Sequence, residues 1–184
     1  MTGKNKHKEA NRDLIRFVEA ASEIFDTFLG GHGFKNEVRE VEDSICTMVY
    51  KRDDLYIKIS ASVHPRDYPY YYNVILGQGS ADWPETDWNS IALWHMKKEV
   101  SPELKAEEYS MVDFDKIDLS LENAKCELEK YGDSFLNGEL TTFEKVRKSI
   151  NQQREPYKIH QKDQAGRFET IIDSASAKLK ERFS

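Results

Sequence analysis

The segment from residue 45 to residue 63 constrains the fold more than any other part of the chain. Its second half, residues 55–63, alternates strictly between apolar and more polar side chains. Such alternation is typical of a β-strand with one face in a core and the other in water. Residues 45–50 alternate as well, and a polar turn at 51–54 separates the halves, so the sequence predicts an antiparallel hairpin. The side chains predicted to face the core are Ile57, Ile59 and Ala61, and those predicted to face the other side are Lys58, Ser60 and Ser62.

Helices flank this strand region. Apolar residues recur at helical spacing over residues 10–29, and a glycine-rich segment ends that helix. Further strands are predicted at 37–42 and 70–76, while 90–96 fits either a short strand or a helical turn. The last third predicts helices from 118 or 120 to 131, from 141 to the residue before Pro156, and from 168 to the C-terminus.

This order of elements predicts one α+β domain over residues 1–184, with residues 1–9 as a flexible tail. We expect an antiparallel sheet of about three to five strands, one N-terminal helix and about three C-terminal helices.

Composition restricts the functional classes. The 184 residues are 39% hydrophobic and 11% aromatic, enough to form a core, and no window resembles a membrane span or signal peptide. A cytoplasmic protein without membrane contact is therefore expected. The net charge of −6 argues against nucleic-acid binding, which depends on neutralising phosphates. Cys46 and Cys126 lie far apart in sequence and are predicted to be buried, reduced thiols.

The charge is unevenly distributed along the chain. Residues 80–140 hold 15 acidic and 6 basic side chains, whereas residues 141–184 carry a net charge of +4. Glu103, Glu107 and Glu108 belong to the acidic segment and are candidates for attracting a basic partner protein. The same residues also fit a solvated surface, or one that packs against the basic C-terminal segment.

Aromatic side chains gather next to the acidic segment. Tyr and Trp combine a large apolar area with a polar tip, which suits recognition surfaces. The same rings also fit a loop that folds over the sheet as a small second core, and the sequence leaves both interpretations open. The candidate binding residues of this group are Tyr70, Tyr72, Trp83, Trp88 and Trp94.

No familiar catalytic, cofactor or metal-binding motif occurs in the chain. We therefore expect no cofactor and no metal ion. The strongest candidate for chemistry is a cleft that joins His64 and Asp67 at a strand end with His95 and Trp94. Such a group could bind a small ligand or act as acid and base in a hydrolase. Ordinary polar loop residues are the alternative.

The glycine-containing turn at residues 29–34, which follows a helix and precedes a strand meander, resembles small bacterial α+β families of unknown function. The helix end at residues 129–136 is similar in style. These families include immunity proteins of toxin loci, so the resemblance implies a non-enzymatic protein-binding domain and no catalytic residues. It spans about half of the chain. A small-ligand binder or hydrolase using the His64 cleft is the alternative, and the sequence does not indicate an oligomeric state.

Overall fold

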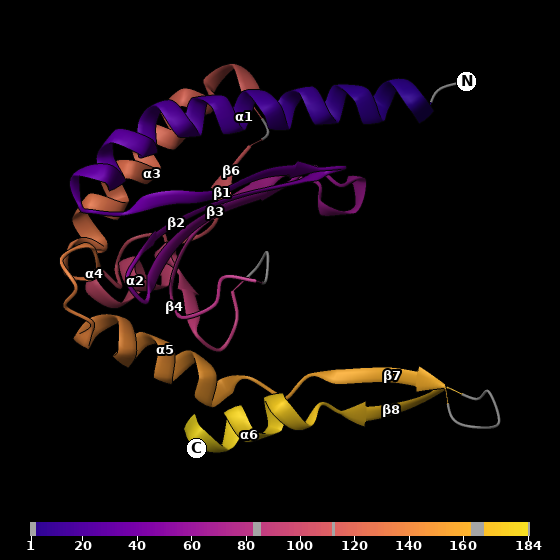
Figure 1. The fold of residues 1–184 in the computed structure, drawn as a ribbon, viewed down its shortest axis with the longest axis vertical. Coiled ribbons are helices and arrows are strands. Elements are labelled where there is room, and N and C mark those ends of the chain that lie inside the picture. Colours follow the sequence, from indigo (N-terminus) through magenta and orange to yellow (C-terminus); the bar gives the residue numbers. More distant parts are fainter. Residues whose placement is uncertain (1–2, 83–85, 112, 163–167, 184) are drawn as a thin grey trace.

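The computed structural model describes residues 3–82, 86–111, 113–162 and 168–183 (Figure 1). Within these ranges the chain forms a six-stranded antiparallel sheet, a separate two-stranded hairpin and six α-helices. The predicted α+β class is confirmed, and the sheet has more strands than the three to five expected. Its strands are β1 (Lys35–Glu42), β2 (Ile45–Arg52), β3 (Leu55–Ser62), β4 (Tyr71–Gln78), β5 (Ser90–Ala92) and β6 (Tyr109–Ser110).

Strands β1 to β4 form a meander in chain order, joined at its first two turns by two-residue loops. Asp53 in the second loop has a φ of 53°, a conformation that Asp tolerates better than most residues. The predicted hairpin pairs Tyr50 with Ile57 and Cys46 with Ala61. The strands predicted at 37–42 and 70–76 are confirmed as well. Beyond β4, β5 pairs with its C-terminal half and β6 with its first two residues.

Helices α1 (Gly3–Gly31) and α3 (Ile117–Tyr131) cover one face of the sheet (Figure 1). The apolar residues of α1 that recur at helical spacing, among them Leu14, Phe17 and Phe25, are fully buried. The helix ends before Gly33, whose φ of 81° is left-handed and readily adopted by glycine. It includes residues 3–9, which the sequence predicts as a flexible tail.

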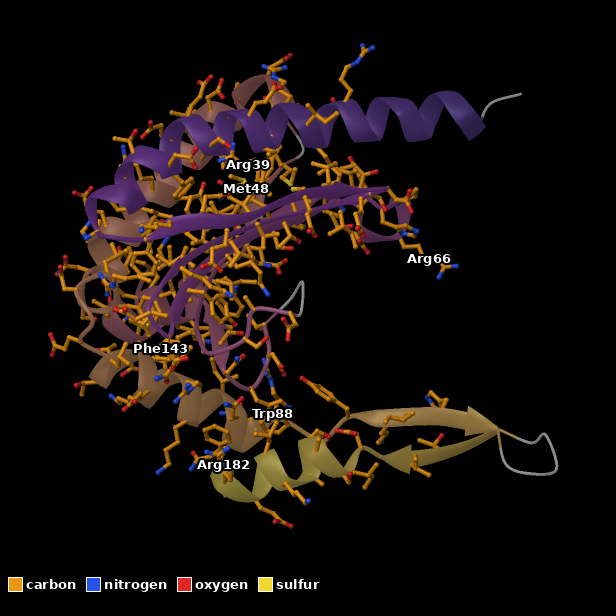
Figure 2. All side chains as sticks on the ribbon, in the orientation of Figure 1. Arg39, Met48, Arg66, Trp88, Phe143 and Arg182 are labelled. Atoms are coloured by element: carbon orange, nitrogen blue, oxygen red, sulfur yellow. The ribbon has the colours of Figure 1, made fainter. Side chains whose placement is uncertain are left out.

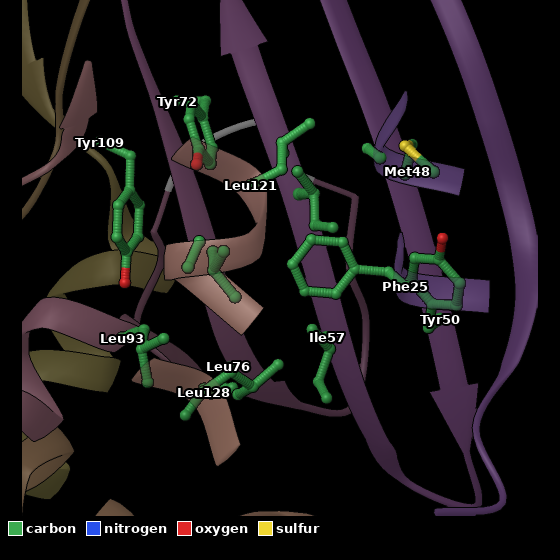
Figure 3. Close-up of a cluster of buried hydrophobic side chains, with 14 of the residues drawn as sticks. Phe25, Met48, Tyr50, Ile57, Tyr72, Leu76, Leu93, Tyr109, Leu121 and Leu128 are labelled. Carbon is green, nitrogen blue, oxygen red and sulfur yellow. The ribbon is translucent and has the colours of Figure 1, made fainter. Parts of the chain in front are cut away.

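The main core lies between these helices and the sheet (Figure 3). Ile57, Ile59 and Ala61 all face it, as the alternation predicts. Tyr72 of β4 is fully buried there, with its ring 5.1 Å from that of Phe17 and stacked at 5.1 Å on that of Tyr109. The face of β3 that points towards the helices was therefore predicted correctly.

For the opposite face of β3, the predicted exposure to water is wrong at one residue. Lys58, expected in water, is fully buried. Its cross-strand neighbours Val49 and Ile75 and the ring of Tyr56 form a second, smaller apolar cluster around it. The Lys58 ammonium lies 5.8 Å from the centre of the Tyr56 ring. Period-two alternation shows which side chains share a face, but it does not show that a second cluster covers the other face.

Residues 90–96 contain both a short strand and a helical turn, the two alternatives that the sequence left open, because β5 leads directly into α2 (Leu93–Val100). The helix predicted from 118 or 120 to 131 is confirmed as α3, and the helix predicted from 141 is confirmed as α5 (Thr141–Gln153). Short 3₁₀ helices occur at Pro65–Asp67 and Phe114–Lys116. Between α3 and α5 lies the short helix α4 (Asp133–Leu136).

The long helix predicted from 168 to the C-terminus is wrong. The chain there forms an antiparallel hairpin of β7 (Lys158–Lys162) and β8 (Phe168–Ile172), followed by α6 (Ser174–Phe183). The Asp173 carboxylate accepts a hydrogen bond from the Ser176 backbone N–H at 2.7 Å, and this cap starts the helix after the strand.

Both cysteines are free thiols, but only Cys46 is buried; Cys126 is exposed on α3, contrary to expectation. Among the described residues, no helix combines the length and apolarity needed to cross a bilayer.

Candidate functional site

The sheet face opposite α1 and α3, called here the open face, carries two hollows on its surface. Side chains that alternate with the core residues of β1, β2, β3 and β4 line both of them. Ile45, at the start of β2, borders both hollows and is 41% exposed. The two hollows therefore adjoin each other around one exposed apolar side chain.

The larger hollow has a volume of about 510 Å³ and an apolar floor that includes Val38, Val49 and Ala81. Its lining carries four carboxylates and one ammonium group. The ammonium of Lys51 already forms an ion pair with Glu37 at 3.1 Å. The four carboxylates belong to Glu40, Glu42, Asp43 and Asp82, and none of them forms an ion pair within the described part of the chain.

The smaller hollow, about 270 Å³, is lined by the ends of β2, β3 and β4. Asp67 accepts a hydrogen bond from the Ser62 hydroxyl at 2.6 Å, and Glu108 accepts one from the Asn73 amide at 2.7 Å. The buried Oδ1 of Asn73 has no hydrogen-bond partner. Two carboxylates and an unpartnered carbonyl oxygen make this hollow rich in acceptors, and no basic side chain is found among its described lining residues.

The open face therefore has a defined chemical preference. Like charges that share a groove repel one another, and a cationic group that enters the groove relieves this repulsion. Ammonium and guanidinium groups carry only donors, which match carboxylate and carbonyl acceptors. The described geometry favours a ligand with several positive charges around an apolar contact at Ile45.

The predicted aromatic residues are not gathered on an exposed surface. Tyr72 is fully buried and Trp88 is 3% exposed, so both are core residues and unavailable to a partner in this conformation. Tyr70 packs partly buried against the main core, and Trp94 of α2 is half-buried. Trp83 lies outside the described residues. Among the described rings of this group, the core interpretation fits better than the recognition surface.

The three predicted acidic residues lie between α2 and β6. Glu103 and Glu107 are exposed, and Glu107 forms an ion pair with Lys105 at 2.6 Å. Only Glu108 lines a hollow of the open face. Glu40, Glu42 and Asp43, which line the larger hollow, lie outside the acidic segment at 80–140. The alternation of β1, which puts Glu40 and Glu42 on one face, is the sequence signal that could have identified them.

Neither hollow forms the alternative cleft. His64 and Asp67 lie at the end of the sheet marked by Arg66 in Figure 2, and of the predicted cleft residues only Asp67 is among the described residues that line a hollow. His95 and Trp94 lie on α2, which starts directly after Ala92, the β5 residue that pairs with Ile75 in the middle of β4. The exposed His64 ring accepts a hydrogen bond from the Arg66 backbone N–H at 3.2 Å, which is a local turn contact. Burial, opposed by a backbone hydrogen bond, lowers the pKa of His95 to about 4.

Metal-binding chemistry has no described site either. Within the described ranges, His, Cys, Asp and Glu side chains nowhere gather into a group of three or more that could hold a metal ion. Comparison with known proteins finds no matching family model and no significant match among curated proteins or solved structures.

Proposed function

We propose that this chain is a non-enzymatic protein-binding domain whose open face holds a basic segment of a partner protein. The observation that carries the proposal is the lining of the two hollows. Their described lining residues include six carboxylates and one basic side chain, Lys51, which is already paired with Glu37.

Charge and apolar area contribute differently to such binding. Six carboxylates increase the rate of encounter with a basic partner and fix its orientation, in a manner that salt weakens. Ile45 and the apolar floor at Val38 and Val49 supply the desolvated contact that gives a complex its lifetime. The partner segment is therefore expected to place an apolar side chain between lysines or arginines.

An inhibitor of a cationic protein would need such a surface. The resemblance to immunity proteins of toxin loci agrees with this role, and an immunity-like function is the specific form of the proposal. The small-ligand or hydrolase alternative has less support, because Asp67 lines a hollow of the open face while His64, Trp94 and His95 are not among the described lining residues.

The experiment uses charge reversal on matched surfaces. The test variant carries Glu40→Lys, Glu42→Lys and Glu108→Lys, and the control variant carries Glu19→Lys and Glu23→Lys on the exposed side of α1. Basic proteins captured from the source organism are identified, purified and titrated into the native chain and both variants by calorimetry. We expect a stoichiometric, salt-sensitive complex with the native chain and the α1 variant, and at least about tenfold weaker binding to the open-face variant.

Equal binding by all three proteins would place the interface elsewhere and overturn the proposal. Circular dichroism and thermal unfolding of the variants show that any loss of binding does not arise from unfolding. Co-expression of the chain with the captured protein tests the immunity-like form, since protection of the cells should require the native open face.

A further inference from the structure

The loop before β5, helix α5 and helix α6 meet on the side of the molecule away from α1, at the base of the β7–β8 hairpin (Figure 2). Trp88, just before β5, stacks on Phe183 of α6 with ring centres 6.2 Å apart. The buried amide of Asn151 in α5 donates to the Trp88 carbonyl at 2.7 Å. Tyr157, which precedes β7, donates its hydroxyl to Asp87 at 2.5 Å. These contacts join the loop before β5, α5 and the C-terminal elements.

Two arginines lie at this junction. Arg147 belongs to α5, and Arg154 directly follows Gln153, the last residue of that helix. The Arg154 guanidinium lies 5.9 Å from the centre of the Trp88 ring and donates to the Thr86 hydroxyl at 3.1 Å. The Arg147 guanidinium lies 5.0 Å from the centre of the Phe143 ring and contacts Gln78 at 3.4 Å.

Across the described residues no ion pair involves Arg147, Arg154 or Arg182 of α6. Arg147 Nε and Arg154 Nη1 are buried nitrogen atoms without a hydrogen-bond partner. Asp87, a carboxylate at this junction, accepts hydrogen bonds from the Tyr157 hydroxyl and from the Trp88 backbone N–H.

Unpaired, partly buried cations are costly, and buried unsatisfied donors normally have a partner such as water or an ion. Burial lowers the pKa of Arg147; the negative charge of Glu144 opposes this, and the positive charge of Arg182 adds a smaller lowering effect. The planar guanidinium fork of arginine matches the oxygen atoms of phosphates and carboxylates. The junction therefore has excess positive charge and free donors in a chain whose net charge is −6.

We propose that this junction is an oxyanion-binding site in which Arg147 and Arg154, supported by Arg182, hold a phosphate or carboxylate group. Arg147 and Arg154 are both half-buried, so neither residue is enclosed in the core. A bound anion would link α5 to α6 and strengthen the attachment of the C-terminal elements. The site is separate from the open face and does not depend on the proposed function.

The competing explanation is that both arginines serve only to pack against Phe143 and Trp88. The two explanations differ in their response to anions. Packing alone is insensitive to phosphate, whereas a binding site is stabilised by its ligand in proportion to occupancy.

The test titrates inorganic phosphate, pyrophosphate and succinate into the native chain, with sodium chloride added to keep the ionic strength constant. Thermal unfolding and the NMR signals of the arginine Nε–H groups are followed. We expect saturable stabilisation and shifts of the Arg147 and Arg154 signals, with the order of the three probes separating phosphate from carboxylate preference. The variants Arg147→Gln and Arg154→Gln should weaken apparent affinity by roughly tenfold or more.

Lys148→Gln is the matched control, because Lys148 lies on the same helix but is exposed. It should bind like the native chain. Arg182→Gln is a second test variant at an exposed position, where the substitution does not disturb the core, and it should bind more weakly. Stabilisation that is the same in every variant, or that chloride reproduces, would show a nonspecific salt effect and overturn the proposal, as would unshifted arginine signals.

Discussion

The ring of Tyr56 lies across the backbone of Gly77, its partner on β4, so closely that a Cβ atom at Gly77 would stand 2.1 Å from Tyr56 Cζ. Tyr56 is 1% exposed and belongs to the small cluster on the open face, so its ring has little room to move. Glycine at this strand position is required by close packing and not by backbone conformation.

Gly77→Ala should therefore lower the free energy of unfolding by about 1–3 kcal/mol through overpacking. Gly30→Ala is the control, since a Cβ at Gly30 in α1 meets no atom within 4 Å and alanine favours the helix. It should be neutral or stabilising. Urea unfolding measures both. The double variant Tyr56→Ala with Gly77→Ala should lose less than the sum of the single losses, and strict additivity would contradict the steric explanation.

Glu127 of α3 joins two other elements in a mostly buried network. Its carboxylate accepts hydrogen bonds from Lys97 of α2 at 2.5 Å and from the Tyr109 hydroxyl of β6 at 2.7 Å. Burial, together with these carboxylate contacts, raises the pKa of Tyr109 and keeps its phenol protonated.

Glu127→Ala should cost about 2–3 kcal/mol of unfolding free energy, because it leaves the Lys97 ammonium without its partner at a site that is only 16% exposed. Glu122→Ala on the same helix removes an exposed pair with Lys125 and should cost less than about 0.5 kcal/mol. Chemical denaturation compares the two. Similar losses in both variants would show that the Glu127 network contributes little.

His95 should make the fold sensitive to acid. Its pKa is lowered to about 4 in the folded chain from an ordinary value of 6.5, mainly by burial. The unfolded chain therefore binds the proton more readily, so the stability contribution is complete above pH 6.5 and is lost as the pH falls towards 4. His95→Gln should reduce the slope of stability against pH in this window. A variant that keeps the slope of the native chain would contradict this prediction.

The two thiols should differ in reactivity. Burial, only partly opposed by a backbone hydrogen bond, raises the pKa of Cys46 to about 12, so it carries almost no thiolate at neutral pH. Cys126 is exposed. One thiol per chain should react with a soluble disulfide reagent under native conditions, and two should react after unfolding. Cys126→Ser should abolish the native reaction, while Cys46→Ser should preserve it.

The β7–β8 hairpin should open more readily than the sheet. An isolated two-stranded hairpin is marginally stable in water, and this one leaves Ile159 and Ile172 exposed. Amide hydrogen exchange should be faster in β7 and β8 than in β2 and β3, whose strands are paired on both sides. Equal protection of the two regions would mean that the hairpin has a partner in solution.

The sequence predicted an element correctly where contacts within that element determine its structure. Strict alternation in residues 55–63 predicted β3 and its core face, because period-two alternation is a property of the strand itself. The C-terminal hairpin was missed because Ile171, Ile172 and Ala175 also recur at helical spacing. The capping contact between Asp173 and Ser176 was the local signal that separates strand from helix.

The candidate site was less predictable. The larger hollow brings Glu40 and Glu42 of β1 next to Asp82, which follows β4, although some 40 residues separate them in the chain. A count of charges along the sequence therefore selected the segment at 80–140, and among its described acidic residues only Asp82 and Glu108 line the two hollows. Likewise, the sequence could not show that the ring of Tyr72 turns inward to stack on that of Tyr109.

The agreement between strand order and chain order in β1–β4 has a consequence for synthesis on the ribosome. Most pairings of the meander join neighbouring segments, so the loops that must close are short and their entropic cost is small. The meander and α1 can assemble while the rest of the chain is still being made. Until α3 emerges, however, the apolar face of β4 around Tyr72 and Leu76 lacks part of its cover, and the nascent chain is most open to misassociation during that interval.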